Sequence, residues 1–96
     1  MSVSDPFRTM VYFPLTIDSD LSLTAQSVLR RECGDHICAI TLEYRPDRHE
    51  VRLWITLAAA AYVLAVHVLI AEVPAAEFGS VRPSKYESAS APGHLR

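Results

Sequence analysis

Cys33, Asp35, His36 and Cys38 lie close together in the chain, and all four carry side chains that bind metal ions. Thiolate, carboxylate and imidazole groups are the usual ligands of zinc. In an extended segment His36 and Cys38 point to the same side, but the spacing of the four residues matches no standard zinc pattern. We therefore predict no metal site and no cofactor, and we expect Cys38 to pack in the core as a small hydrophobic side chain.

The remaining histidines show no pattern typical of catalysis. General acid–base chemistry needs a reacting partner within hydrogen-bond reach of the imidazole ring. His49, His67 and His94 have no nucleophile or carboxylate at a telling spacing. We predict that the protein is not an enzyme and has no catalytic residue.

An aromatic and basic group is a candidate binding surface. Tyr12, Arg52 and Trp54 occupy the polar positions of two segments in which apolar and polar residues alternate, so they would share one face of a sheet. Aromatic and arginine side chains are frequent at the centres of protein interfaces. A partner interface and ordinary packing on the sheet both fit this pattern.

Composition narrows the class of protein. The chain has 96 residues, of which 50% are hydrophobic and 21% are charged, as expected for one small folded domain. Its net charge is −2, and its arginines are interleaved with acidic residues, which argues against a nucleic-acid partner. Two cysteines without a paired framework, and an N-terminus without a basic region followed by an apolar stretch, favour a cytoplasmic protein.

Alternating side chains predict the strands that would position these residues. Half-buried strands are predicted for residues 10–17, 36–44 and 51–57, and the last two flank a polar turn as in a hairpin. A weaker pattern predicts a fourth strand in residues 77–82. Pro14 lies inside the first strand, and because proline lacks an N–H group we expect a bulge or a distorted strand there.

Two segments have helical patterns. Residues 22–33 place Ala25, Val28 and Leu29 on one face, with Ser22 as the expected N-cap and Gly34 as the stop. The second helix is predicted for residues 58–73, which are rich in alanine and end before a proline.

The second predicted helix is apolar on all sides. We expect four of its residues to face the sheet, namely Val63, Val66, Ile70 and Val73. The outer side would then carry Ala61, Leu64, Ala65 and Val68. A helix that is apolar all round needs a cover on both sides, so we predict that Leu64 and Val68 belong to a partner interface together with Tyr12, Arg52 and Trp54.

The predicted order of elements is β-α-β-β-α-β. This order is typical of the ferredoxin-like α+β fold, a four-stranded antiparallel sheet with two helices on one face. We expect residues 1–9 to form an arm, residues 10–83 the domain and residues 84–96 a disordered tail.

Residues 10–83 resemble an ACT domain, and more narrowly the short ACT-only small subunits of acetohydroxyacid synthase. The resemblance rests on residues 34–38, Gly-Asp-His-Ile-Cys, which are similar to a Gly-x-His-Val-Cys stretch of such subunits, on the hairpin length and on residues 55–58. It implies a regulatory subunit that forms a homodimer and docks on a larger catalytic subunit of an amino-acid biosynthetic enzyme.

The resemblance also implies a place for an amino-acid effector. In ACT domains the loop between the first strand and the first helix binds the effector through exposed backbone groups. The corresponding residues here are Asp18, Ser19, Asp20, Leu21 and Ser22. Leu21 stands where the family has a glycine, and a non-glycine residue does not readily adopt positive φ, so a subunit without an effector stays an alternative.

A second interpretation places the chain in a membrane. Residues 53–71 are apolar except for Thr56 and His67, and they nearly reach the length that spans a bilayer. The protein would then be a single-span membrane accessory protein with His67 as a pigment or haem ligand. The alternation in residues 51–57 favours a strand followed by a helix instead.

Overall fold

The three alternating segments form strands of nine residues each, β1 (Met10–Asp18), β2 (Ile37–Arg45) and β3 (Glu50–Ala58). These bounds come from a computed structural model that describes residues 9–84. Both β1 and β2 pair with β3 in antiparallel orientation. The predicted hairpin of the second and third strands is therefore confirmed.

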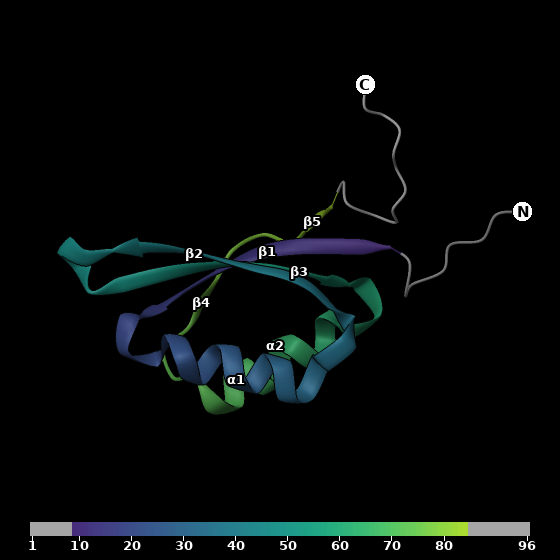
Figure 1. Cartoon of the computed structure of the whole chain (residues 1–96), viewed down its shortest axis with the longest axis horizontal. Helices are drawn as coiled ribbons and strands as arrows, with labels where there is room; N and C mark the ends of the chain where they lie inside the picture. Colours follow the sequence, from purple (N-terminus) through teal and green to yellow (C-terminus); the bar gives the residue numbers. More distant parts are fainter. Residues whose placement is uncertain (1–8, 85–96) are drawn as a thin grey trace, which may run out of the picture.

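Two helices cover one face of this sheet, as Figure 1 shows. They are α1 (Ser22–Cys33) and α2 (Tyr62–Glu72). The strand order is β2-β3-β1-β4, and the short strands β4 (Glu77–Phe78) and β5 (Arg82–Pro83) both pair with β1. The protein thus has the predicted ferredoxin-like α+β fold, with a fourth strand that is divided into two pieces.

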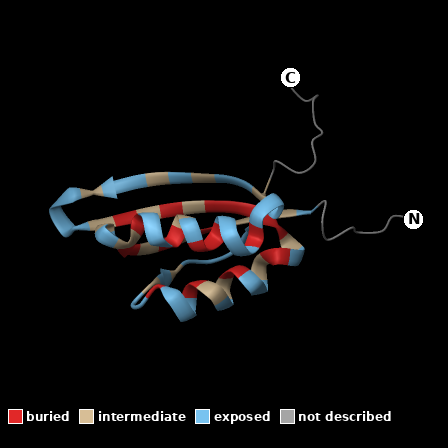
Figure 2. Ribbon diagram, turned by 60° about the horizontal axis from the view of Figure 1, so that its bottom comes forward, coloured by how far each residue is buried: buried red, intermediate tan, exposed pale blue. Residues whose placement is uncertain are grey.

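The core lies between the sheet and the helices. Alternate residues of the central strands are fully buried, including Phe13, Leu15, Leu53 and Ile55, because side chains at every second position of a strand share a face. The predicted inner face of α1 is also confirmed: Ala25, Val28, Leu29 and Cys33 are buried. Figure 2 shows the buried residues on the sides of strands and helices that face one another.

Cys38 is exposed, and its predicted burial is wrong. Ile37 pairs with Leu57 of β3, but the next pair joins Ala39 to Thr56, so one extra residue lies between them. Such a bulge shifts the side chains that follow relative to those before it. Ile37 therefore packs against the core in the place that alternation assigned to Cys38.

Pro14 distorts the fourth strand, whereas the predicted distortion of β1 itself is wrong. β1 pairs with β3 over all nine residues without a shift of register. The Pro14 carbonyl accepts a hydrogen bond from the Gly79 N–H at 2.8 Å, so this side of Pro14 faces the fourth strand. A proline offers no N–H in return, and the register of the fourth strand shifts by one residue between β4 and β5.

The inner face of α2 differs from the predicted one. Ala61, Ala65, Leu69 and Val73 are buried, whereas Val63 and Ile70 are 64% and 62% exposed. Of the four residues predicted to face the sheet, only Val73 is fully buried. Because apolar residues occupy every side of this helix, periodicity cannot identify the inner face. The helix follows β3 through the 3-10 turn Ala59–Ala61.

The first helix begins after a 3-10 turn, Ser19–Leu21, and not at an N-cap formed by Ser22. Asp18 caps this turn, since its Oδ1 accepts a hydrogen bond from the Asp20 N–H at 2.9 Å. Ser22 is buried in the first turn of α1, and its Oγ accepts a hydrogen bond from Gln26 Nε2. Gly34 ends the helix with φ of 41°, as predicted.

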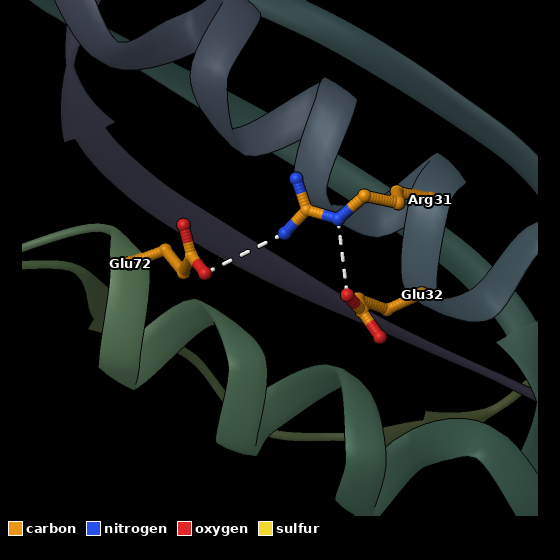
Figure 3. Close-up of polar contacts among 3 residues, drawn as sticks. All are labelled: Arg31, Glu32 and Glu72. Atoms are coloured by element: carbon orange, nitrogen blue, oxygen red, sulfur yellow. Dashed lines mark hydrogen bonds and ion pairs between the residues drawn. The ribbon is translucent and has the colours of Figure 1, made fainter.

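The two helices are joined at their surface by an ion pair. Arg31 of α1 lies 3.5 Å from Glu72 of α2 and 3.0 Å from Glu32 on its own helix (Figure 3). All three side chains are partly or largely exposed. Their electrostatic contribution is therefore screened by water, and the apolar layer between helices and sheet carries most of the stability.

The long apolar segment, residues 53–71, is divided between a strand, a turn and a short helix. Within residues 9–84 no helix is long and apolar enough to cross a membrane. Residues 53–71 therefore do not form the single helix that the alternative interpretation expects, and His67 lies exposed on α2. The predicted arm and tail, apart from Thr9 and Ser84, lie outside the described residues.

Candidate functional site

Tyr12, Arg52 and Trp54 meet on the face of the sheet opposite the helices, and we call them the aromatic–arginine cluster. Their neighbours along the strands, such as Phe13 and Leu53, are buried in the core, so alternation directs the cluster outward. The ring centroids of Tyr12 and Trp54 are 6.2 Å apart, and the Arg52 guanidinium lies 5.9 Å from the Trp54 centroid. The sequence predicted this grouping.

Two further side chains hold the cluster in place. Trp54 Nε1 donates a hydrogen bond to Glu43 Oε1 at 3.3 Å, and Arg52 Nε donates to Thr16 Oγ1 at 3.5 Å. Glu43 and Thr16 were not among the predicted site residues. The signal was present, because each lies on the polar side of an alternating segment and the pairing of β2 with β3 brings Glu43 opposite Arg52.

The structure separates the predicted partner interface into two surfaces. Leu64 is 44% exposed and Val68 is half-buried, and both belong to α2. α2 covers one face of the sheet (Figure 1) and packs in the core with Phe13 and Leu53, whereas the aromatic–arginine cluster lies on the other face. One partner surface that contains all five predicted residues would have to wrap around the domain, so the two groups are distinct candidates.

A hollow of about 260 Å³ lies beside the cluster, and we call it the Trp54 hollow. It is lined by Tyr12, Pro14, Trp54, Ser80 and Arg82. The last two come from the interrupted fourth strand. Sequence reasoning missed Pro14, Ser80 and Arg82 as site residues, because the hollow exists only where the fourth strand breaks.

The predicted effector loop, Asp18 to Ser22, uses much of its own hydrogen-bonding capacity. The Ser19 N–H donates to the His49 carbonyl at 2.9 Å, the Asp20 N–H donates to Asp18, and the Ser22 N–H donates to Ser19. Leu21 has φ of −98°, an ordinary value for a non-glycine residue. Effector binding stays a prediction, but these three N–H groups are already occupied.

A smaller hollow of about 180 Å³ lies next to this loop. Its lining combines acidic and basic side chains, including Asp18, Arg48, Glu50 and Glu77. A zwitterion such as a free amino acid has the charges to match this mixture. The loop residues Ser19 to Ser22 are not part of the lining, so of the predicted effector residues only Asp18 reaches the hollow.

The two cysteines lie in different environments. Cys33 is buried, and burial together with the nearby Glu32 carboxylate raises the pKa of its thiol above the ordinary value. Cys38 is exposed on β2. Among residues 9–84, no three or more histidine, cysteine, aspartate or glutamate side chains are grouped so that they can hold a metal ion.

Comparison with known proteins gives no assignment. No protein-family model, curated protein or solved structure matches this chain.

Proposed function

We propose that the protein is a non-catalytic, ACT-like binding subunit that docks on a larger amino-acid biosynthetic enzyme, such as acetohydroxyacid synthase. The observation that carries this proposal is the aromatic–arginine cluster. Tyr12, Arg52 and Trp54 are half-buried, and their buried neighbours along the strands face the helices, so the three side chains lie on the opposite face of the sheet. Large aromatic and arginine side chains that are already fixed in position lose little entropy on binding, which suits the centre of an interface.

The hydrogen bonds of the cluster support binding and not catalysis. One joins an indole N–H to a carboxylate, and the other joins a guanidinium to a hydroxyl group. Nucleophilic catalysis would require a nucleophile next to a group that accepts its proton. A guanidinium stays protonated and cannot accept one, so Arg52 does not activate the Thr16 hydroxyl.

We propose that the subunit forms a homodimer through β2. This strand lies at the end of the sheet, is nine residues long and contains no proline. An unpaired strand edge of this length offers a row of backbone N–H and C=O groups to another strand. Pairing of β2 with β2 of a second copy would extend the sheet and leave the aromatic–arginine cluster uncovered.

Docking would regulate the enzyme through its conformational equilibrium. A subunit that binds one conformation of the catalytic subunit more tightly than another increases the population of that conformation. An amino-acid effector near Asp18 would change this preference by binding to one state. The free thiols of Cys33 and Cys38 support a cytoplasmic location, where cysteines stay reduced.

The test is reconstitution with the catalytic subunit of acetohydroxyacid synthase. We expect the wild-type protein to bind it and to change its activity, and Trp54→Ala to weaken binding about 30-fold, as loss of an interface hot spot does. Leu23→Ala is the matched control, because Leu23 is apolar, is 78% exposed and lies on α1, on the helix side of the sheet.

Two results would contradict the proposal. The first is a wild-type protein that neither binds the catalytic subunit nor changes its activity. The second is binding that Trp54→Ala leaves intact while Leu23→Ala weakens it, since the docking surface would then be the helix layer.

A further inference from the structure

We infer that the Trp54 hollow binds a small planar aromatic molecule that carries a carboxylate group. This inference does not depend on the proposed docking, because it concerns the isolated subunit. It rests on three features of the hollow: two aromatic rings in its wall, an arginine that forms no ion pair within residues 9–84, and a break in the fourth strand.

The two rings provide surfaces for an aromatic ligand. Tyr12 and Trp54 have their centroids 6.2 Å apart and their planes inclined at 44°, so the two rings do not stack on each other. Pro14 lies directly opposite Trp54 in the paired strands and also lines the hollow. A flat ring that enters the hollow therefore meets aromatic and proline surfaces, which favour stacking and edge contacts.

Arg82 provides the charge. It lies beside Tyr12 on β5 and lines the hollow, and within residues 9–84 no ion pair involves it. A guanidinium binds a carboxylate through two parallel hydrogen bonds. The Ser80 hydroxyl, in the same lining, can donate or accept a further hydrogen bond.

The break in the fourth strand leaves room for the ligand. Pro14 lacks the N–H that a continuous ladder needs, and Gly79 approaches its ring so closely that an added Cβ would lie 2.4 Å from Pro14 Cγ. The chain then leaves the regular register between β4 and β5. Tyr12 of β1 consequently borders a hollow where a continuous fourth strand would run.

The charge around the hollow favours a small monoanion over a nucleic acid. Glu43 is hydrogen-bonded to Trp54 and lies opposite Arg52 in the paired strands, so it offsets part of the positive charge of Arg52. A polyanion gains its affinity from several basic side chains along its backbone. A ligand with a single carboxylate, in contrast, needs only one basic side chain, which Arg82 provides.

Anthranilate is a suitable probe, because it is a planar ring with one carboxylate and accepts excitation energy from tryptophan. Trp54 is the single tryptophan of the chain, so quenching of its emission reports binding to the domain, and the Arg82→Ala variant locates the site. We expect saturable quenching by anthranilate, and binding of the neutral anthranilamide at least about 10-fold weaker because the ion pair is lost. Arg82→Ala should remove this preference, whereas Arg30→Ala on the exposed side of α1 should keep it.

Three results would overturn the inference: no saturable quenching by anthranilate, equal affinity for the two probes, or an Arg82→Ala variant that still prefers anthranilate. Tighter binding of a short oligothymidine than of anthranilate would also overturn it, in favour of a nucleic-acid surface. Circular dichroism of Arg82→Ala shows whether the fold is kept. Failure here leaves the reconstitution with the catalytic subunit unaffected, so the two proposals are tested separately.

Discussion

At the scale of single residues, the contact between Pro14 and Gly79 determines how the fourth strand is built. An alanine at position 79 would place its Cβ 2.4 Å from Pro14 Cγ and 3.0 Å from Pro14 Cδ. Both atoms belong to the rigid ring of a residue in the central strand β1, so the backbone has to move. We expect Gly79→Ala to lower the free energy of unfolding by about 1–3 kcal/mol, as overpacking does. Urea denaturation measures this change.

A double-mutant cycle separates this contact from a general effect on the loop. In a Pro14→Ala background the clashing ring atoms are absent, so Gly79→Ala should cost clearly less than in the wild type. An equal cost in both backgrounds would show that Pro14 is not the cause.

The two cysteines should differ in reactivity and in their effect on stability. Cys38 is exposed and should react with a thiol reagent in the native protein, whereas buried Cys33 should react only after unfolding. The raised pKa of Cys33 means that the native thiol stays protonated when the unfolded thiol ionises. The resulting stability is present below about pH 8.5, the ordinary thiol pKa, and is lost as the pH rises above it.

Denaturation between pH 7 and 10 tests this dependence. The free energy of unfolding of the wild type should fall more steeply than that of Cys33→Ala above pH 8.5. Equal slopes for the two proteins, or fast labelling of Cys33 in the native state, would contradict this assignment.

At the scale of elements, the two helices should be held mainly by apolar packing. Glu72→Gln removes the ion pair with exposed Arg31 (Figure 3) and should change the free energy of unfolding by less than about 1 kcal/mol. Leu69→Ala removes a fully buried side chain of the same helix and should cost about 2–5 kcal/mol. Thermal or urea denaturation of both variants ranks the two effects. A larger loss of stability in Glu72→Gln than in Leu69→Ala would show that the ion pair, and not apolar packing, holds the helices.

The proposed dimer depends on backbone groups at the outer edge of β2. Backbone groups alternate in direction along an antiparallel strand, and the hydrogen bonds of β1 to the fourth strand fix the alternation across the sheet. Residues Ile40, Leu42 and Tyr44 then point their N–H and C=O groups away from β3. Tyr44→Pro removes one of these donors at an exposed position and should shift a dimer toward monomer in light scattering.

Tyr44→Ala is the control for this prediction, because it removes the side chain and keeps the backbone donor. If both variants weaken the dimer equally, the tyrosine ring and not the strand edge forms the contact.

At the scale of the whole molecule, alternation and helical periodicity were enough to predict the fold. They place β1, β2, β3 and both helices, because each central strand buries one face and each strand is long enough to show its period. These patterns fail where apolar residues lie on every side of an element, because they cannot then identify its buried face. α2 is apolar on every side, so Val63 and Ile70 were assigned to the core although Ala65 and Leu69 occupy it.

Alternation predicted the aromatic–arginine cluster of the candidate site but not the hollow beside it. Tyr12, Arg52 and Trp54 follow from alternation within single strands, which the sequence shows directly. The Trp54 hollow and the exposure of Cys38 depend on a break in the fourth strand and on a bulge in β2. The break and the bulge depend on how neighbouring strands pair, and the alternation of residues within one strand does not predict that pairing.

Fluorine NMR tests most directly whether the face of the sheet that carries Trp54 meets the partner. Incorporation of 5-fluorotryptophan labels one position, because the chain has a single tryptophan. We predict that this resonance shifts or broadens when the unlabelled catalytic subunit of acetohydroxyacid synthase is added, and that the Leu23→Ala variant behaves in the same way. A resonance that stays unchanged while the catalytic subunit demonstrably binds would contradict the claim and assign docking to another surface.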